Sequence, residues 1–112
     1  MKWVTHIAWG VLTLRFFGLG LQEALGLSIL HTMVTDILGH RGLRRSRYHD
    51  VIAILAGAAL TAAVGLSPLP GIALGLVHVA LDLVSPGKLA VSWWYNLPFL
   101  ALPLAVMAYL GW

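Results

Sequence analysis

The sequence predicts an all-α protein: a polytopic integral membrane bundle of about five transmembrane helices, forming a single domain over residues 1–112. Hydrophobic residues make up 60% of the chain and charged residues 10%, whereas an ordinary soluble domain carries about 25% charged residues. The mean hydropathy is +0.89. The apolar runs do not alternate, and within lipid only helices and closed barrels satisfy every backbone polar group. These observations together predict a multi-pass protein of the cell's inner membrane.

Five apolar runs are expected to form the helices. They are Trp3–Leu21, Ala24–Gly39, His49–Leu66, Gly71–Ser85 and Leu97–Trp112. A span needs about 20 apolar residues, with a lower limit of about 17, so the second and fourth runs are expected to end against neighbouring helices or in the membrane interface. The first run is longer than the hydrophobic part of a secretory signal peptide and lacks its cleavage pattern. We therefore interpret it as a retained span.

Turn residues and basic charges determine the expected topology. Residues 67–71 (SPLPG) and 85–88 (SPGK) break the chain, because proline and glycine interrupt helices. The loop between the second and third runs holds several arginines, and with five spans Lys2 and Lys88 lie on the same side as that loop. Basic loops face the cytoplasm, so the N-terminus is expected there and the C-terminus outside. The arginines of the loop are Arg41, Arg44, Arg45 and Arg47.

Six ionisable residues interrupt these apolar runs, and the expected topology brings all of them to the cytoplasmic face. They are His6, Asp36, His40, His49, His78 and Asp82. The topology rests on apolar runs and basic charges alone and does not use the positions of these six residues. Their convergence is therefore independent support for a shared site. Ionisable groups inside apolar spans are costly and persist mainly where they pair, bind ions or line a polar cavity. The Asp36/His40 and His78/Asp82 pairs have the i, i+4 spacing that places both side chains on one helix face.

This set of imidazoles and carboxylates predicts a site for a divalent metal ion, zinc above all. The chain contains no cysteine, which excludes thiolate ligands. A catalytic zinc commonly has three protein ligands, so six candidates imply either two ions or one ion with the remaining groups around it as hydrogen-bonding partners and general base. Asp36 and Asp82 are the candidate catalytic carboxylates. Asp50 is a candidate ligand or a hydrogen-bond acceptor for the neighbouring imidazole of His49.

The order of these motifs resembles that of one known family. The pieces are Thr5-His6, the segment 36–40 (DILGH), the segment 47–50 (RYHD) and the segment 75–82 (GLVHVALD) followed by Pro86-Gly87. Together they are similar to the membrane-bound metal-dependent hydrolases, which include the LexA-binding inner-membrane-associated hydrolase and archaeal relatives of unknown function. The similarity extends from about Thr5 to Pro98. One departure is Tyr48-His49-Asp50, where the family usually has Thr-His-Ser, so the Thr and Ser hydroxyls that flank the histidine in the family are missing here.

The resemblance implies a small helical membrane protein with a hydrolytic metal centre, whose ligands would be the six residues named above. We therefore expect a metal-dependent hydrolase acting at the cytoplasmic face. A site at head-group depth favours an amphiphilic substrate, such as the ester or phosphoester of a lipid, whose charge Arg41 or Arg45 would neutralise. The expected partners are membrane lipid, other membrane proteins or further copies of the chain. Nucleic acid is not expected, because the basic run is short and has little aromatic interleaving.

Other interpretations remain open at this point. The chain could be a small accessory subunit of a larger membrane complex, with a structural or vestigial metal site. The i, i+4 pairs could be simple intrahelical hydrogen bonds, and the arginines could act as topology determinants that attract anionic lipids. Haem ligation by His6 and His78 is a further alternative, although carboxylates suit hard divalent cations better. His31 lies five residues before Asp36 and is expected to be a packed or interfacial histidine.

Overall fold

Five α-helices make up most of the fold of the computed structural model, which describes residues 1–41, 44, 45 and 48–112, and only the backbone of residues 40, 41, 44 and 45. The helices are α1 (Trp3–Phe16), α2 (Leu21–Gly39), α3 (His49–Ala63), α4 (Pro68–Leu83) and α5 (Trp93–Leu110). Between α2 and α3 lie two short antiparallel strands, β1 (His40–Arg41) and β2 (Arg44–Arg45), and a 3-10 turn, η1 (Gly87–Val91), precedes α5. The predicted all-α class and the number of helices are confirmed.

Three helices, α2, α4 and α5, begin earlier than their apolar runs predict, and serine side chains cap the last two. Ser67 Oγ accepts a hydrogen bond of 3.2 Å from the backbone N–H of Leu69, and α4 begins with a proline. A proline is tolerated in the first turn of a helix, where its missing N–H would have no partner. Ser92 caps α5 in the same way. Residues 67–71, which the sequence indicates as a break between the third and fourth runs, therefore mainly form the start of α4.

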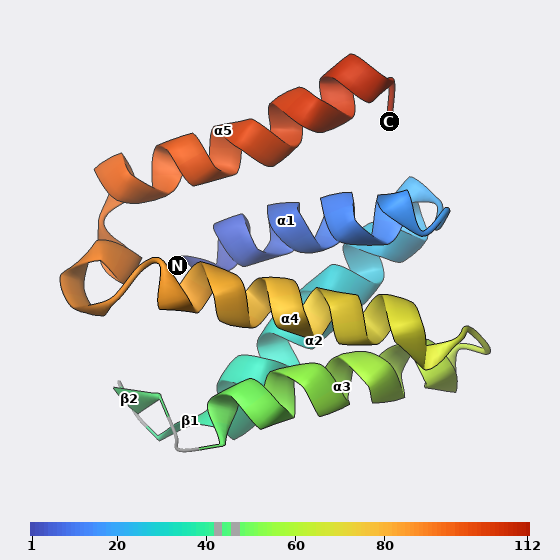
Figure 1. Ribbon diagram of the computed structural model, residues 1–112, viewed down its shortest axis with the longest axis horizontal. Helices are drawn as coiled ribbons and strands as arrows, with labels where there is room; N and C mark the ends of the chain where they lie inside the picture. The colour runs from blue at the N-terminus through green and yellow to red at the C-terminus, as the bar shows by residue number, and fades with distance from the viewer. Residues whose placement is uncertain (42–43, 46–47) are drawn as a thin grey trace.

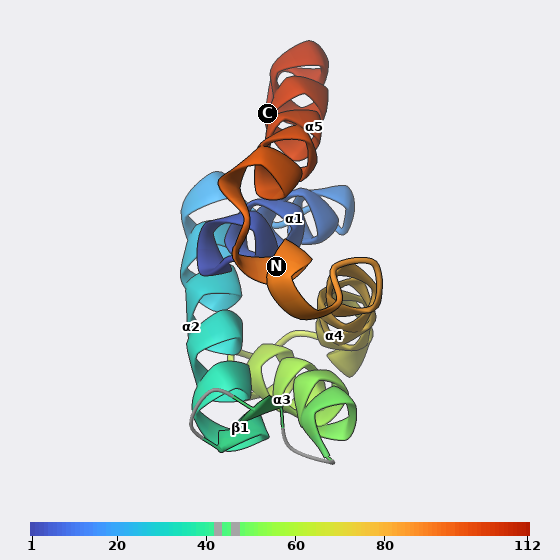
Figure 2. The same ribbon diagram turned by 90° about the vertical axis from the view of Figure 1, so that its left-hand side faces the viewer.

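The helices are arranged as a bundle with α5 at its edge. Figures 1 and 2 show α1, α4 and α3 following one another below α5, with α2 crossing behind them. The most extensive packing joins α3 to α4, while α1 packs against α2, α4 and α5. Most of the packing between distant segments therefore lies among the first four helices.

The backbones of α3 and α4 come into direct contact at glycines. A methyl group added at Gly71 would lie 1.8 Å from the carbonyl oxygen of Gly57, and one added at Gly75 would lie 2.5 Å from the Cα atom of Ile54. Gly71 and Gly75 are four residues apart on one face of α4, the small-xxx-small spacing that allows close helix approach in membrane proteins. This contact determines how near the functional side chains of α3 and α4 can come.

A tryptophan hydrogen bond attaches α5 to α1. Pro103 lies inside α5 and has no N–H, so it removes the helical hydrogen-bond partner of the Phe99 carbonyl. The indole Nε1 of Trp9, on α1, donates a hydrogen bond of 2.7 Å to that carbonyl. The polar group freed by the proline is thus paired across the helix interface.

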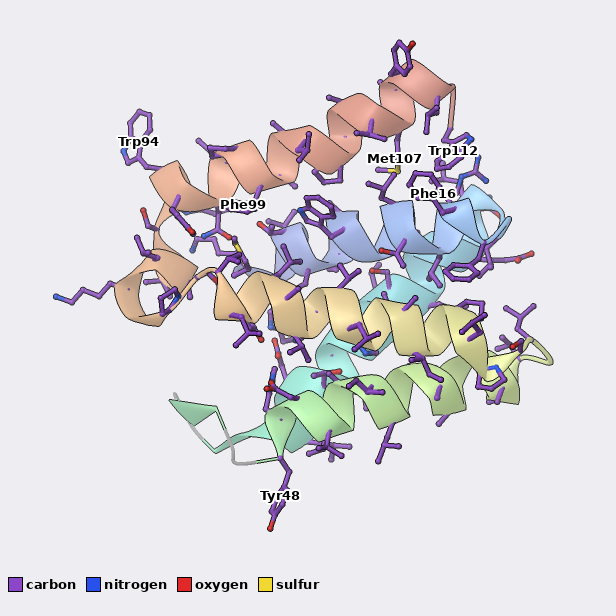
Figure 3. The ribbon with its side chains drawn as sticks, in the orientation of Figure 1. Phe16, Tyr48, Trp94, Phe99, Met107 and Trp112 are labelled. Carbon is purple, nitrogen blue, oxygen red and sulfur yellow. The ribbon has the colours of Figure 1, made fainter. Side chains whose placement is uncertain are left out.

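Polar side chains are concentrated inside the bundle, and large apolar side chains cover its outside. The buried polar residues include Ser28, His31, Thr32, Thr35 and Thr61. The exposed large hydrophobic residues occur on all five helices, and Figure 3 shows Trp94 projecting away from the bundle. Among the described residues, buried polar residues are about as numerous as buried hydrophobic ones, whereas in a soluble domain they are a clear minority.

Within the described residues, α5 is the one helix that combines the length and the apolar composition needed to cross a membrane. The apolar helices α3 and α4 have 15 and 16 residues, and α1 has 14. By this measure the structure contains one candidate span, fewer than the sequence-based expectation. The difference arises because α1, α3 and α4 are short, while α2 has 19 residues but its apolar sequence is interrupted by polar side chains.

Candidate metal centre

Five of the six predicted ligand residues meet at one end of the first four helices. His6 comes from the first turn of α1, Asp36 from the last turn of α2 and His49 from the first residue of α3, while His78 and Asp82 lie one turn apart near the end of α4. The three imidazoles are buried, with exposed fractions of 5% for His6, 0% for His49 and 3% for His78. The alternation of helix direction therefore gathers residues that are far apart in the sequence.

Two imidazole nitrogens and two carboxylate oxygens form a closed ring in which the two kinds of atom alternate. His49 Nε2 lies 3.7 Å from Asp36 Oδ1 and 3.6 Å from Asp82 Oδ2. His78 Nε2 lies 3.9 Å from Asp36 Oδ1 and 3.5 Å from Asp82 Oδ2. We call these four residues the ligand ring.

The distances between neighbouring atoms around the ligand ring are close to those around a metal ion. Zinc binds nitrogen and carboxylate oxygen at about 2.0–2.2 Å, so neighbouring ligand atoms of a tetrahedral site lie about 3.3–3.6 Å apart. The separations of 3.5–3.9 Å in the ring exceed this range by a few tenths of an ångström at most. Two sets of three residues, Asp36/His49/His78 and His6/His78/Asp82, also have ligand atoms close enough to hold an ion. The buried His/Asp group can therefore hold a metal ion.

His6 differs from the ligand ring because its imidazole is stacked on that of His78. The ring centroids are 3.9 Å apart and the ring planes are inclined by 14°. An imidazole binds a metal through a lone pair that lies in the ring plane, and lone pairs in two nearly parallel stacked planes do not converge on one ion. His6 Nε2 instead lies 3.0 Å from Asp82 Oδ1, at hydrogen-bond distance. The same stacking is incompatible with haem ligation by His6 and His78, which requires the two rings on opposite faces of the macrocycle.

The second nitrogen of His49 is oriented by a carboxylate. His49 Nδ1 lies 3.2 Å from Asp50 Oδ1, the next residue along the chain. A carboxylate that accepts from one ring nitrogen fixes the tautomer and leaves the other nitrogen able to bind a metal. Asp50 therefore occupies the position of a hydrogen-bond acceptor behind His49, one of the two roles that the sequence suggested for it.

Buried nitrogen atoms of the cluster have no hydrogen-bond partner among the described residues. They are His6 Nδ1 and both ring nitrogens of His78. A buried polar atom without a partner costs about 1–3 kcal/mol, so native structures rarely keep two on one side chain. For His78 Nε2, which faces both carboxylates of the ligand ring, a bound cation would supply the missing partner.

Three predicted site residues have side chains outside the described part of the chain. The backbone of His40 and Arg41 forms β1, and that of Arg45 forms part of β2, where His40 pairs with Arg45. This short hairpin directly follows Asp36 and α2. The expected roles of His40 as a ligand and of Arg41 and Arg45 in substrate binding remain predictions.

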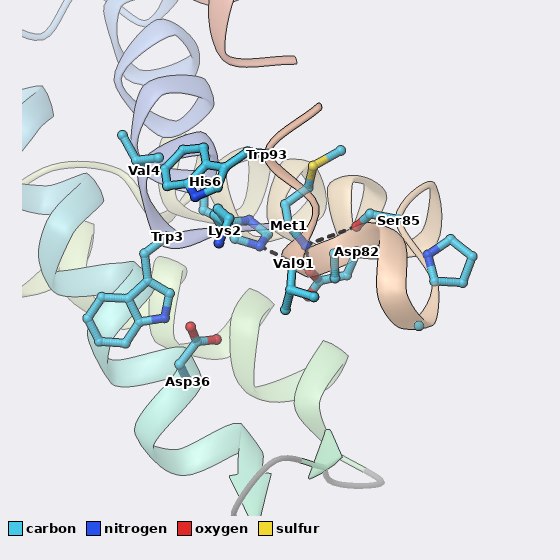
Figure 4. Close-up of a pocket in the computed structure, with 13 residues that line it drawn as sticks. Met1, Lys2, Trp3, Val4, His6, Asp36, Asp82, Ser85, Val91 and Trp93 are labelled. Carbon is cyan, nitrogen blue, oxygen red and sulfur yellow. Dashed lines mark hydrogen bonds and ion pairs between the residues drawn. The ribbon is translucent and has the colours of Figure 1, made fainter. Parts of the chain in front are cut away.

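A pocket of about 750 Å³ opens beside the ligand ring. His6, Asp36 and Asp82 belong to its lining, and Figure 4 shows Asp36 on the α2 side of the pocket and Asp82 on the α4 side. The carboxylates of Asp36 and Asp82 retain exposed fractions of 17% and 14%. His49 and His78 are not part of the lining. The carboxylates therefore form the accessible side of the centre, and the imidazoles of the ligand ring its buried side.

Several residues of the site carry at most a weak signal that sequence reasoning could use. His31, interpreted as a packed histidine, is buried and its Nε2 donates a hydrogen bond of 2.6 Å to the Ala53 carbonyl, yet its ring also lies edge-on to His78 at a centroid distance of 5.4 Å. Ser85 Oγ and Asp82 Oδ1 accept hydrogen bonds from the amino group of Met1 at 2.9 and 3.3 Å. The i, i+3 spacing of Asp82 and Ser85 is a weak signal that could have suggested this contact.

Asn96, on α5, connects three segments next to the pocket. Its Oδ1 accepts hydrogen bonds from the backbone N–H of Lys2 at 2.9 Å and from Thr5 Oγ1 at 3.0 Å. Its Nδ2 donates to the carbonyl oxygens of Ala90 at 3.1 Å and Ser92 at 2.8 Å. The side chain is fully buried. Asn96 therefore fixes the start of α1 relative to η1 and α5.

No protein-family model, curated protein or solved structure significantly matches the chain.

Proposed function

We propose that this chain is an integral membrane metal-dependent hydrolase whose metal ion is held by the ligand ring of Asp36, His49, His78 and Asp82. The observation that carries the proposal is the alternating ring of two imidazole nitrogens and two carboxylate oxygens, 3.5–3.9 Å apart. A pocket adjoins the ring, so a substrate can reach it. Nitrogen and oxygen donors in a compact four-atom set favour zinc over larger cations.

Membrane residence is supported by the distribution of side chains as well as by composition. Polar residues fill much of the interior, and large hydrophobic residues such as Phe16, Leu55 and Trp94 are exposed. Lipid solvates such a surface, whereas water does not. The glycine contact between α3 and α4 is typical of helices that associate in a bilayer. The short helices α3 and α4 would cross with their ends at the interface, as proposed for a multi-pass protein with its N-terminus in the cytoplasm.

The geometry favours one ion rather than two. His78 belongs to both sets of three potential ligands, and the stacking of His6 on His78 prevents these two from sharing an ion. His6 then acts through its hydrogen bond to Asp82, which holds that carboxylate in position. A second ion would need a ligand set that does not use His78.

Each group of the centre has a definite task in hydrolysis. A divalent ion held in the ring supplies Lewis acidity, which activates water near neutral pH. Asp36 and Asp82 line the pocket, so their carboxylates are placed to accept a proton from the attacking water. Water adds to the ester centre, the bond to the leaving oxygen breaks, and the proton passes to that oxygen. The buried imidazoles hold the centre and exclude bulk water from its inner side.

The motif order supports the same conclusion, because the ligand-ring residues occupy the positions at which the sequence resembles the membrane-bound metal-dependent hydrolases. In that resemblance the ligand set includes His6 and His40. In the proposal derived from the geometry, His6 has a positioning role. The expected substrate is amphiphilic, because the pocket combines polar groups with apolar side chains.

Elemental analysis of the protein purified in mild detergent tests the proposal. We expect close to one zinc, manganese or iron ion per chain, and His78→Ala should lose most of it. His31→Ala is a matched control, since His31 is also buried and on the cluster side of the bundle but lies outside the ligand ring. Wild-type protein without metal after purification and zinc titration would refute the proposal. A stable multi-protein assembly without turnover would instead support the accessory-subunit alternative.

A further inference from the structure

The pocket beside the ligand ring contains a cation that is held in place at two points. The ammonium group of Lys2 lies 4.5 Å from the centroid of the Trp93 ring, a cation–π contact. The backbone N–H of Lys2 donates a hydrogen bond to the buried Asn96 side chain. Both Lys2 and Trp93 line the pocket, as Figure 4 shows. The position of this charge is therefore determined before any ligand binds, which reduces the entropy lost on binding.

A bound metal ion would make the pocket strongly attractive to anions. Among the described residues, Asp36 and Asp82 supply the negative charges of the lining, while Lys2 and the amino group of Met1, which lies 3.3 Å from Asp82 Oδ1, supply positive ones. Without the ion these charges offset one another. A divalent cation between the carboxylates would offset the two negative charges, and the positive charges of Lys2 and Met1 would then be in excess.

The rest of the lining suits a hydrocarbon chain. Trp3, Val4, Val91 and Trp93 form apolar walls, and the side chains of Trp3, Val91 and Trp93 are largely exposed. A volume of about 750 Å³ falls within the usual range of small-molecule pockets, about 300–1,000 Å³. The pocket can therefore accommodate a polar head together with part of an attached chain.

We propose that the substrate is a lipid phosphate ester whose phosphate group lies between the metal ion and Lys2. This inference rests on the proposed function. A phosphate ester keeps a negative charge and several unesterified oxygens, so the ion and the ammonium group can contact the same group at once. A neutral carboxylic ester would leave Lys2 without a counter-charge. Water forms a bond to phosphorus, the bond from phosphorus to the lipid oxygen breaks, and the proton from water ends on that oxygen.

Calorimetric titration of the zinc-loaded protein in detergent, together with phosphate release, tests this inference with three matched probes. Dioctanoyl phosphatidic acid carries both head and chains, dioctanoylglycerol lacks the phosphate, and glycerol 3-phosphate lacks the chains. We expect the first to bind at least about tenfold more tightly than either of the others, and only in the presence of zinc. Equal binding of glycerol 3-phosphate would show a site for soluble phosphate esters and would overturn the lipid assignment.

Variants of Lys2 separate this inference from the proposed function. Lys2→Gln should keep its zinc and lose the preference for the anionic lipid by about tenfold, while Lys2→Arg should retain most of it. Lys88→Gln is the matched control, because Lys88 is exposed nearby and does not line the pocket. Unchanged lipid binding by a zinc-loaded Lys2→Gln protein would overturn the inference and leave the metal centre intact. Absence of metal from the wild type would overturn both.

Discussion

Replacing Gly71 with alanine should damage the metal centre from a distance. The added methyl group would lie 1.8 Å from the Gly57 carbonyl oxygen, and the two nearest atoms that it meets belong to the Gly57 backbone rather than to a flexible side chain. Normal contact needs about 3.5 Å, so α3 and α4 must separate by roughly 1.5 Å. His49 and His78 lie on these two helices.

A displacement of that size is large compared with the tolerance of a metal site. Ligands must stay within about 0.5 Å of their working positions, and the ring distance of 3.6 Å between His49 Nε2 and Asp82 Oδ2 would grow toward 5 Å, an increase of about 1.5 Å. We expect zinc affinity to fall by about a hundredfold, because losing the support that orients metal ligands already costs about 10–100-fold at other sites. Overpacking should also cost about 1–3 kcal/mol of stability.

The assay is competitive zinc titration with a chromophoric chelator, combined with thermal unfolding in detergent. Gly26→Ala is the matched control, because Gly26 lies inside α2 with no neighbouring atom within 4 Å of the added methyl group. That control should bind zinc normally and gain up to about 1 kcal/mol from helix propensity. If Gly71→Ala binds zinc as tightly as the wild type, the reasoning from the backbone contact to the site is wrong.

Three further predictions concern residues around the centre. Asn96→Leu should lower the free energy of unfolding in detergent by about 2–4 kcal/mol, because it leaves the Lys2 N–H and the Thr5 hydroxyl without an acceptor. A change below about 0.5 kcal/mol would contradict this role of Asn96. Trp9→Phe should lower the free energy of unfolding by about 1 kcal/mol and speed amide hydrogen exchange in α5, because the Phe99 carbonyl loses its donor. Equal exchange rates in the variant and the wild type would show that this bond does not hold α5. His6→Gln should keep one metal ion per chain, because His6 is stacked on His78 and bonds to Asp82 rather than completing the ring; loss of the ion from a folded variant would restore His6 as a ligand.

Much of the fold follows from the amino-acid composition and from the positions of proline and glycine. The apolar runs predict the five helices, and the proline and glycine segments locate their ends to within a few residues. Two of the errors have a local cause: Ser67 and Ser92 cap helices that then start before their apolar runs. A serine beside prolines indicates a turn as readily as a cap, so the sequence does not distinguish the two.

The convergence of the site was also predictable, but its internal geometry was not. Helix spacing and topology suffice to bring Asp36, His49, His78 and Asp82 to one end of the bundle. They do not determine how side chains from different helices are oriented to one another. The stacking of His6 on His78 depends on the rotation of α1 against α4, which tertiary packing sets. Asn96 was missed because an asparagine near the start of an apolar helix looks like a solvated helix end.

The bond from Trp9 to the Phe99 carbonyl has a consequence for assembly. None of the five clustered side chains comes from α5, so coordination and attachment of the last helix are separate tasks. A directional bond to a carbonyl exposed by Pro103 selects one rotational and axial register of α5 on α1, which apolar surfaces alone would leave degenerate. The last helix can therefore take a single register on α1 without contributing a side chain to the cluster.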